Sequence, residues 1–121
     1  MTIERYPSPL GLPFSRMVRA QGFVFFSGQI PMDEQGQVVR GDIRTQTHAV
    51  MGRLQDSLRE VGLGFGDVIK ATVWLSDLAM FADFNDVYAS YFKDGLPVRS
   101  TVQAQLAMGV DLEIEIQAIE R

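Results

Sequence analysis

The chain contains no cysteine and a single histidine, His48, among its 121 residues. Without cysteine there can be no disulfide and no thiol chemistry, and the composition fits a cytoplasmic protein. One histidine without cysteine also makes a poor metal site, because zinc and related ions prefer several His or Cys ligands. We therefore expect a chain that works without a metal or any other cofactor.

Lysine is scarce as well, and the only two, Lys70 and Lys93, fall at the start of a predicted strand and at the end of a predicted helix. Neither position desolvates an amine enough to keep it neutral, which argues against Schiff-base catalysis. The remaining basic residues are nine arginines, scattered along a chain of net charge −4. Nucleic-acid binding needs a concentrated basic face, so we expect no nucleic-acid partner.

Long apolar runs are also missing from the chain. No run approaches the roughly 20 residues that span a membrane. Glu4 and Arg5 stand where a signal peptide would carry its apolar core, which argues against secretion. We expect no membrane partner and a cytoplasmic location.

The apolar residues that are present, 46% of the chain, follow regular periods. Periods of two predict strands and periods of three to four predict helices. In chain order they predict strands at 2–6, 16–21 and 23–27, a helix at 43–61, a strand at 67–76, a second helix after Asp77, and strands at 98–104 and 111–118. Asp42 is the expected N-cap of the first helix, and Gly62 and Gly64 end it; Asp77 is the expected N-cap of the second helix. We expect one α+β domain over residues 1–121, with a mixed sheet and two helices on one face.

Two helices can cover only one face of a sheet of this size. The runs 23–26 and 71–75 nevertheless have apolar residues on both faces, including Trp74 on the side opposite to Val73 and Leu75. Such a face would form a large exposed patch in water. The sequence therefore predicts self-association, without indicating a copy number.

The second helix carries an aromatic stripe at helical spacing: Phe81, Phe84, Val87/Tyr88 and Tyr91/Phe92. Such a stripe is typical of a helix that packs in the core.

Two charges in the last third of the chain are candidate functional groups. Arg99 follows Pro97 among small and β-branched residues, so its guanidinium either reaches solvent, pairs with a carboxylate of the protein or binds an anionic ligand. Glu113 lies on the polar side of the strand at 111–118, where an acid is most often simply solvated. The spacing alone leaves these alternatives open.

Three segments of the chain form a specific combination: FFSGQIP at 25–31, PVRSTV at 97–102 and LAMGVDLEIEIQAI at 106–119. Together they resemble the RidA family, the YjgF-like reactive intermediate deaminases that hydrolyse 2-enamines and 2-imines and are also labelled endoribonuclease L-PSP. The resemblance covers nearly the whole chain. It implies a chorismate mutase-like fold and a homotrimer, in which the sheets form a barrel-like core and the ligand sites lie between subunits.

The resemblance also implies roles for particular residues. Arg99 would bind the substrate carboxylate, and Glu113 beside it would position or activate the attacking water. Burial would raise the pKa of Glu113 and the guanidinium would lower it, and the sequence leaves the balance open. Asn85 matches a site position of the second helix, and Ser27 and Gly28 match a wall of the site.

Two positions depart from the usual family pattern. Thr101 replaces a common Cys, which keeps a small hydrogen-bonding group but no thiol. Phe14 replaces a common Tyr, which removes a phenolic hydroxyl from the substrate-binding residues. The leading hypothesis is a cofactor-free deaminase that converts small 2-imino acids to 2-keto acids and ammonia. The alternatives are a non-catalytic protein that binds or senses small carboxylates and, less favoured, a ribonuclease.

Overall fold

The computed structural model, which describes residues 2–121, contains one six-stranded sheet with the strand order β1-β2-β3-β6-β4-β5. Only β4 and β5 are parallel neighbours; the other pairs are antiparallel. The elements are β1 (Glu4–Pro7), β2 (Ser15–Ala20), β3 (Phe23–Gln29), α1 (Ile43–Glu60), β4 (Val68–Leu75), α2 (Phe81–Ala89), β5 (Val98–Gln103) and β6 (Leu112–Ile119). The predicted order of strands and helices and the mixed α+β sheet are confirmed.

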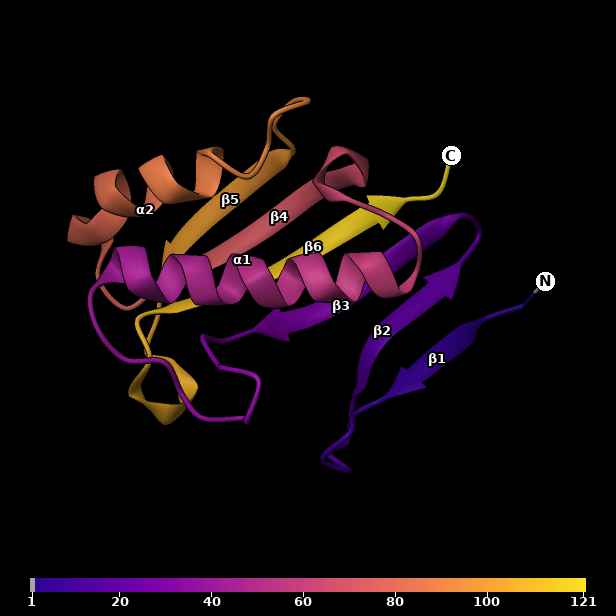
Figure 1. Ribbon diagram of the computed structural model, residues 1–121, viewed down its shortest axis with the longest axis horizontal. Helices are drawn as coiled ribbons and strands as arrows, with labels where there is room; N and C mark the ends of the chain where they lie inside the picture. The colour runs from indigo at the N-terminus through magenta and orange to yellow at the C-terminus, as the bar shows by residue number, and fades with distance from the viewer. Residues whose placement is uncertain (1) are drawn as a thin grey trace.

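Both helices lie against the same face of the sheet, with α1 crossing in front of the central strands and α2 near β5 at the edge (Figure 1). The core fills the space between these two layers. In β6 the alternation of the sequence is reproduced, because the residues on the helix-covered face are buried: Leu112, Ile114, Ile116 and Ala118. Glu113 and Glu115 therefore lie on the face that carries no helix.

The helix ends follow the expected signals with one difference. The Asp42 side chain accepts a hydrogen bond from the Thr45 backbone N–H at 2.8 Å, as predicted for an N-cap. Gly62 adopts a positive φ of 75° just after α1. The prediction that Asp77 caps the second helix is wrong in detail: it caps a short 3-10 turn, Leu78–Met80, that leads into α2. The prediction missed that turn because both kinds of helix begin with the same capping chemistry.

The aromatic stripe of α2 belongs largely to the core. Phe84, Tyr88 and Phe92 are buried, and their rings pack in series with centroid distances of 5.3 and 4.8 Å. The core interpretation is confirmed for these three rings. Phe81, at the start of the helix, is instead 41% exposed.

The opposite face of the sheet carries exposed apolar side chains. Phe23 and Phe25 point away from the helices, and on β5 so do Val98 and Val102, which is 43% exposed. The predicted apolar character of both faces of the run 23–26 is thus confirmed, and burial of this open face by a second copy stays a prediction. Across residues 2–121, none of the helices combines the length and apolar character needed to span a membrane.

Candidate functional site

Arg99 lies on the edge strand β5 and turns toward the helix-covered face of the sheet. Its strand neighbour in the parallel register is Ala71, which is fully buried on that face. The Arg99 Cζ atom lies 5.4, 5.3 and 4.9 Å from the ring centroids of Phe81, Phe84 and Tyr88 of α2. Three aromatic faces therefore surround one guanidinium and attract it electrostatically. We call this group the Arg99 cage.

Among the described residues, 2–121, the guanidinium in the cage has no carboxylate partner. Two other partly buried arginines are ion-paired, Arg16 with Glu60 and Arg19 with Glu120. For Arg99, which is also partly buried, the structure shows no ion pair and no hydrogen bond within residues 2–121. Partly buried charges are normally paired, so an unpaired guanidinium is a candidate anion-binding group.

Three buried polar atoms around the cage also lack a hydrogen-bond partner: Asn85 Oδ1, Tyr88 OH and Thr101 Oγ1. Asn85 is on the same helical turn as Phe84 and Tyr88, and Thr101 follows Arg99 on the same side of β5. Burial raises the pKa of Tyr88 to about 12, although the positive charge of Arg99 opposes the shift. Because buried polar groups are rarely left unpaired, these atoms represent unused hydrogen-bonding capacity next to Arg99.

Glu113 lies on the other face of the sheet. Its partner in the antiparallel register is Trp74, and its neighbour Leu112 is fully buried on the helix-covered side. A Cβ atom placed on Gly28 would come within 2.1 Å of Glu113 Oε2, so the carboxylate rests directly against the Gly28 backbone. The pKa of Glu113 is raised, first by burial and then by the negative charge of Glu115.

The expectation that Glu113 lies beside Arg99 is therefore wrong within one chain. The strand registers place the two side chains on opposite faces of the same sheet. Burial accordingly determines the pKa direction of Glu113, and Arg99 is not among its causes. A structural ion pair between the two residues is also excluded inside one chain.

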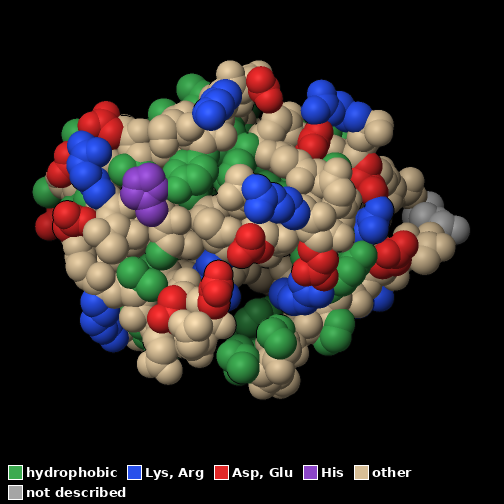
Figure 2. Space-filling model, in the orientation of Figure 1, with side chains coloured by type: hydrophobic (Ala, Val, Ile, Leu, Met, Phe, Trp, Pro, Cys, Tyr) green, Lys and Arg blue, Asp and Glu red, His purple; other side chains and the backbone are tan. Residues whose placement is uncertain are grey.

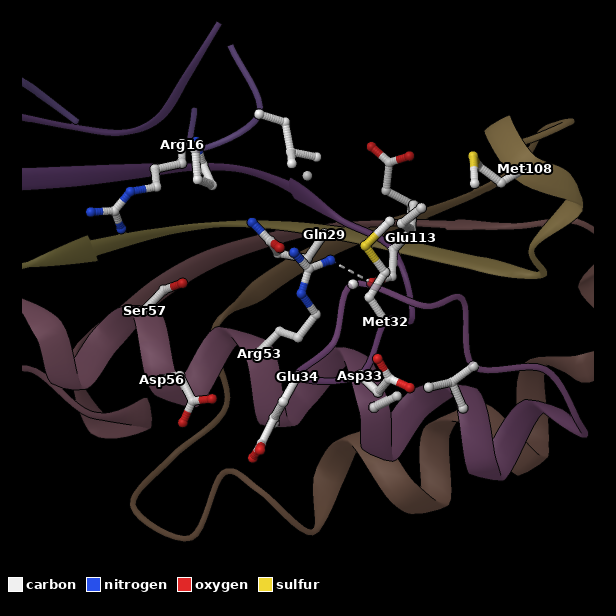
Figure 3. A pocket seen from close by; sticks show the side chains of 18 of the residues that line it. Arg16, Gln29, Met32, Asp33, Glu34, Arg53, Asp56, Ser57, Met108 and Glu113 are labelled. Atoms are coloured by element: carbon white, nitrogen blue, oxygen red, sulfur yellow. Dashed lines mark hydrogen bonds between the residues drawn. The ribbon is translucent and has the colours of Figure 1, made fainter. Parts of the chain in front are cut away.

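Gly28, Glu113 and Phe14 line one cavity of about 1280 Å³ between α1, the loop at 8–14 and the loop at 30–36. Figure 3 shows Glu113 near Met108, which also lines this cavity and has a positive φ of 62°. The left-handed conformation of Met108 is uncommon outside glycine and indicates local strain near a candidate site. Phe14, at the edge of the cavity, is 52% exposed.

Ser27 does not line this cavity. Its hydroxyl donates to the Ser15 backbone oxygen at 2.6 Å, which joins β3 to β2. Ser27 lies inside β3, which continues to Gln29, so the prediction that the strand ends at Ser27 is wrong by two residues. The predicted site residues thus form two groups: Arg99, Asn85 and Thr101 on one face, and Glu113, Gly28 and Phe14 around the cavity.

Sequence reasoning missed Phe81 and Tyr88 as parts of the cage, because it assigned the whole aromatic stripe to the core. The available signal was the hydroxyl of Tyr88, a polar group within an otherwise apolar stripe. It also missed Arg53, which lines the cavity from α1 and donates from Nη1 to the Ile30 carbonyl oxygen at 2.9 Å. Nothing in the spacing of Arg53 separates it from an exposed helix residue.

Comparison with known proteins gives consistent matches over nearly the whole chain. The family described as Endoribonuclease L-PSP matches residues 5–120. A RutC family protein of Pyrococcus horikoshii is 42% identical over 117 residues, which cover 96% of this chain and 91% of the relative. The chloroplastic Reactive Intermediate Deaminase A of Arabidopsis thaliana is 35% identical over 120 residues, covering 98% of this chain and 63% of the relative.

The fold agrees with the same assignment. The crystal structure of E. coli TdcF with bound serine superposes with a TM-score of 0.87 at 36% identity, covering 97% of this chain and 94% of TdcF. Sequence and fold thus match the same group of proteins over their common length. The chain therefore belongs to the RidA/YjgF family, the family described as Endoribonuclease L-PSP.

Proposed function

We propose that this protein hydrolyses small 2-enamine and 2-imino acids to 2-keto acids and ammonia, in clefts between the subunits of a homotrimer. The observation that carries the proposal is the unpaired guanidinium of Arg99, which lies in an aromatic cage lined by buried polar atoms without partners. A planar carboxylate is the anion that this fork binds best, through two parallel hydrogen bonds.

The reaction itself needs few protein groups. An enamine tautomerises to an imine, and water adds to the electrophilic imine carbon to form a tetrahedral carbinolamine. Loss of ammonia from that carbon, with the hydroxyl proton leaving, gives the 2-keto acid. The protein has to hold the carboxylate, place the water and carry protons.

Glu113 suits the proton-carrying role. Burial and Glu115 both raise its pKa, which brings a carboxyl group closer to neutral pH. In its ionised form it accepts a proton from the attacking water, and it returns that proton to the departing nitrogen. Gly28 leaves room for this, because any side chain there would collide with the carboxylate.

A second copy of the chain is required to bring these groups together. Arg99 and Glu113 lie on opposite faces of one sheet. The open face carries Phe25 and Val102, 40% and 43% exposed, which favour burial against another subunit. In the proposed trimer, Arg99 of one copy and Glu113 of the next copy contribute to each cleft.

Two relatives support the substrate class. One is named a reactive intermediate deaminase, and the TdcF structure contains serine, a small molecule with a carboxylate. Binding without turnover is the second candidate function, because the Arg99 cage can hold a carboxylate without Glu113. Ribonuclease activity is not proposed, since the chain carries net charge −4 and several of its arginines are paired with acids.

The test pairs an amino-acid oxidase, which generates the imine, with this protein across a panel of amino acids. We expect faster release of ammonia and keto acid than the spontaneous rate. Saturable keto-acid binding with no acceleration for any imine in the panel would instead identify a non-catalytic binding protein.

A mixing experiment tests whether the site is shared. Arg99→Ala and Glu113→Gln chains, each inactive alone, are unfolded together and refolded at a 1:1 ratio. If each cleft takes Arg99 from one copy and Glu113 from the next, random assortment makes roughly one cleft in four intact. Activity should recover to about a quarter of wild type; a mixture as inactive as its components would show that the site is not shared.

A further inference from the structure

Arg53 is the second partly buried arginine that lacks an acidic partner. It projects from α1, and its one hydrogen bond is the 2.9 Å contact to the Ile30 carbonyl oxygen. No ion pair to Arg53 is present within residues 2–121, and burial lowers its pKa. This bond goes to a neutral carbonyl oxygen and uses only one of the five N–H donors of the guanidinium. The protein thus keeps an uncompensated positive charge partly desolvated at this position.

The surroundings of Arg53 form a distinct end of the cavity. Figure 3 shows its guanidinium beside the Gln29 side chain, with Ser57 on the same helix and Arg16 farther along, while the Glu113 carboxylate points away from it. Arg16 is neutralised by its ion pair with Glu60. Arg53 therefore supplies the unpaired positive charge at this end, with hydroxyl and amide groups next to it. We call this end the Arg53 pocket.

The walls of the Arg53 pocket are apolar on the side of the N-terminal loop. Leu10 and Leu12 line the cavity and are 75% and 48% exposed, and Met32 lines it from the loop at 30–36. In the space-filling view, a hollow opens below α1, with hydrophobic side chains along its lower edge (Figure 2). Exposed leucines beside a partly buried charge form the combination of apolar wall and few polar groups typical of small-molecule sites.

We propose that the Arg53 pocket is a second ligand site, separate from the Arg99 cage, which binds a monocarboxylate with an apolar tail. The carboxylate pairs with the Arg53 guanidinium near Gln29 and Ser57, and the tail covers Leu10 and Leu12. The site lies at the other end of the cavity that Glu113 lines, and it uses neither Arg99 nor Glu113.

The charges around the cavity restrict the ligand to a single negative charge. Four acids line the same cavity, Asp33, Glu34, Asp56 and Glu113, together with Arg53 and with Arg16, which is already paired with Glu60. A dianion such as phosphate would be repelled by this rim more strongly than a monocarboxylate is. The apolar walls add affinity for a hydrocarbon tail and none for phosphate.

The experiment uses phenylacetate as the probe and follows backbone amide signals of the ¹⁵N-labelled protein by NMR. We expect saturable shifts at residues 29–32 and 52–57, with inorganic phosphate at the same concentration causing smaller shifts there. Arg53→Met should weaken phenylacetate binding about 10- to 100-fold, the usual effect of losing a charge-assisted hydrogen bond. Arg59→Met, which removes an exposed arginine from the same helix outside the cavity, should leave binding unchanged.

Two further variants keep the test decisive. Leu12→Asp leaves Arg53 and its bond to Ile30 in place but adds a negative charge to the wall, so it should weaken binding at least about 10-fold. Arg99→Ala should leave the shifts at 29–32 and 52–57 intact. The proposal is overturned if phenylacetate shifts only residues around Arg99 and Asn85, if no shift saturates, if phosphate binds more tightly, or if Leu12→Asp binds like wild type.

Discussion

Replacing Arg99 by alanine distinguishes a substrate clamp from a structural residue. If Arg99 holds the substrate carboxylate in a partly desolvated cleft, the change removes a bidentate, charge-assisted contact of about 2–4 kcal/mol. The kcat/KM for imine hydrolysis should then fall roughly 30- to 1000-fold. Arg99→Lys should recover little of this loss, because an ammonium cannot reproduce the planar fork.

The structure predicts a small effect of the same change on stability. Arg99 has no acidic partner within residues 2–121, so its removal strands no carboxylate of its own chain. What is lost is cation–π attraction to the rings of Phe81, Phe84 and Tyr88, about 1–2 kcal/mol in total. Relief of the desolvation of the guanidinium offsets part of this loss. We expect the Tm to stay within about 4 °C of wild type.

The assay measures both quantities on the same preparation, Tm by calorimetry and hydrolysis by coupled ammonia release. Arg44→Ala is the matched control, since Arg44 is exposed and pairs with Asp83 and Asp86 of the same helix that forms the cage. Its surface ion pairs are worth about 0–1 kcal/mol, so both readouts should stay near wild type. An Arg99→Ala protein that melts many degrees early yet keeps its rate per folded molecule would refute the clamp.

The Glu113 contacts and the open face of the sheet support further predictions. Glu113→Gln should lower kcat/KM at least about 100-fold, and Glu115→Gln should move the acid limb of the wild-type pH–rate profile to lower pH, because Glu115 helps to raise the pKa of Glu113. Since that raised pKa makes ionisation of Glu113 unfavourable in the folded state, Glu113→Gln should also melt above wild type at pH values above the folded pKa, and the difference should vanish below the unfolded pKa. Gly28→Ala would place a Cβ 2.1 Å from Glu113 Oε2, so the Glu113 side chain has to move away; we expect loss of most of the activity with little change in stability. Gly52→Ala, with open space at its Cβ, should stabilise α1 by about 0.5–1 kcal/mol in urea unfolding. Light scattering should give a mass above the 13.5 kDa of one chain, and Phe25→Asp on the open face should lower that mass and abolish hydrolysis together; a wild-type monomer would contradict the shared cleft.

The sequence by itself determined the types and order of the elements. Short-range periods of two and of three to four residues are properties of neighbouring side chains, so they were sufficient to predict the strands, both helices and the Asp42 cap. The same alternation predicted that Glu113 and Leu112 lie on opposite faces of one strand. The motif around Arg99 and Glu113 also identified the family before any contact between elements was known.

The tertiary structure alone decided which face each strand turns toward the helices. On β5 the valines Val98 and Val102 face away from the helices and Arg99 faces them, although valine is the more apolar residue. This arrangement is possible because α2 places aromatic rings over the guanidinium and because the open face is itself apolar. The pairing of β5 and β6 with β4, set by long-range packing, puts Arg99 and Glu113 on opposite faces. No local pattern encodes the relative register of strands that are far apart in the chain, so only the folded sheet could separate these two residues.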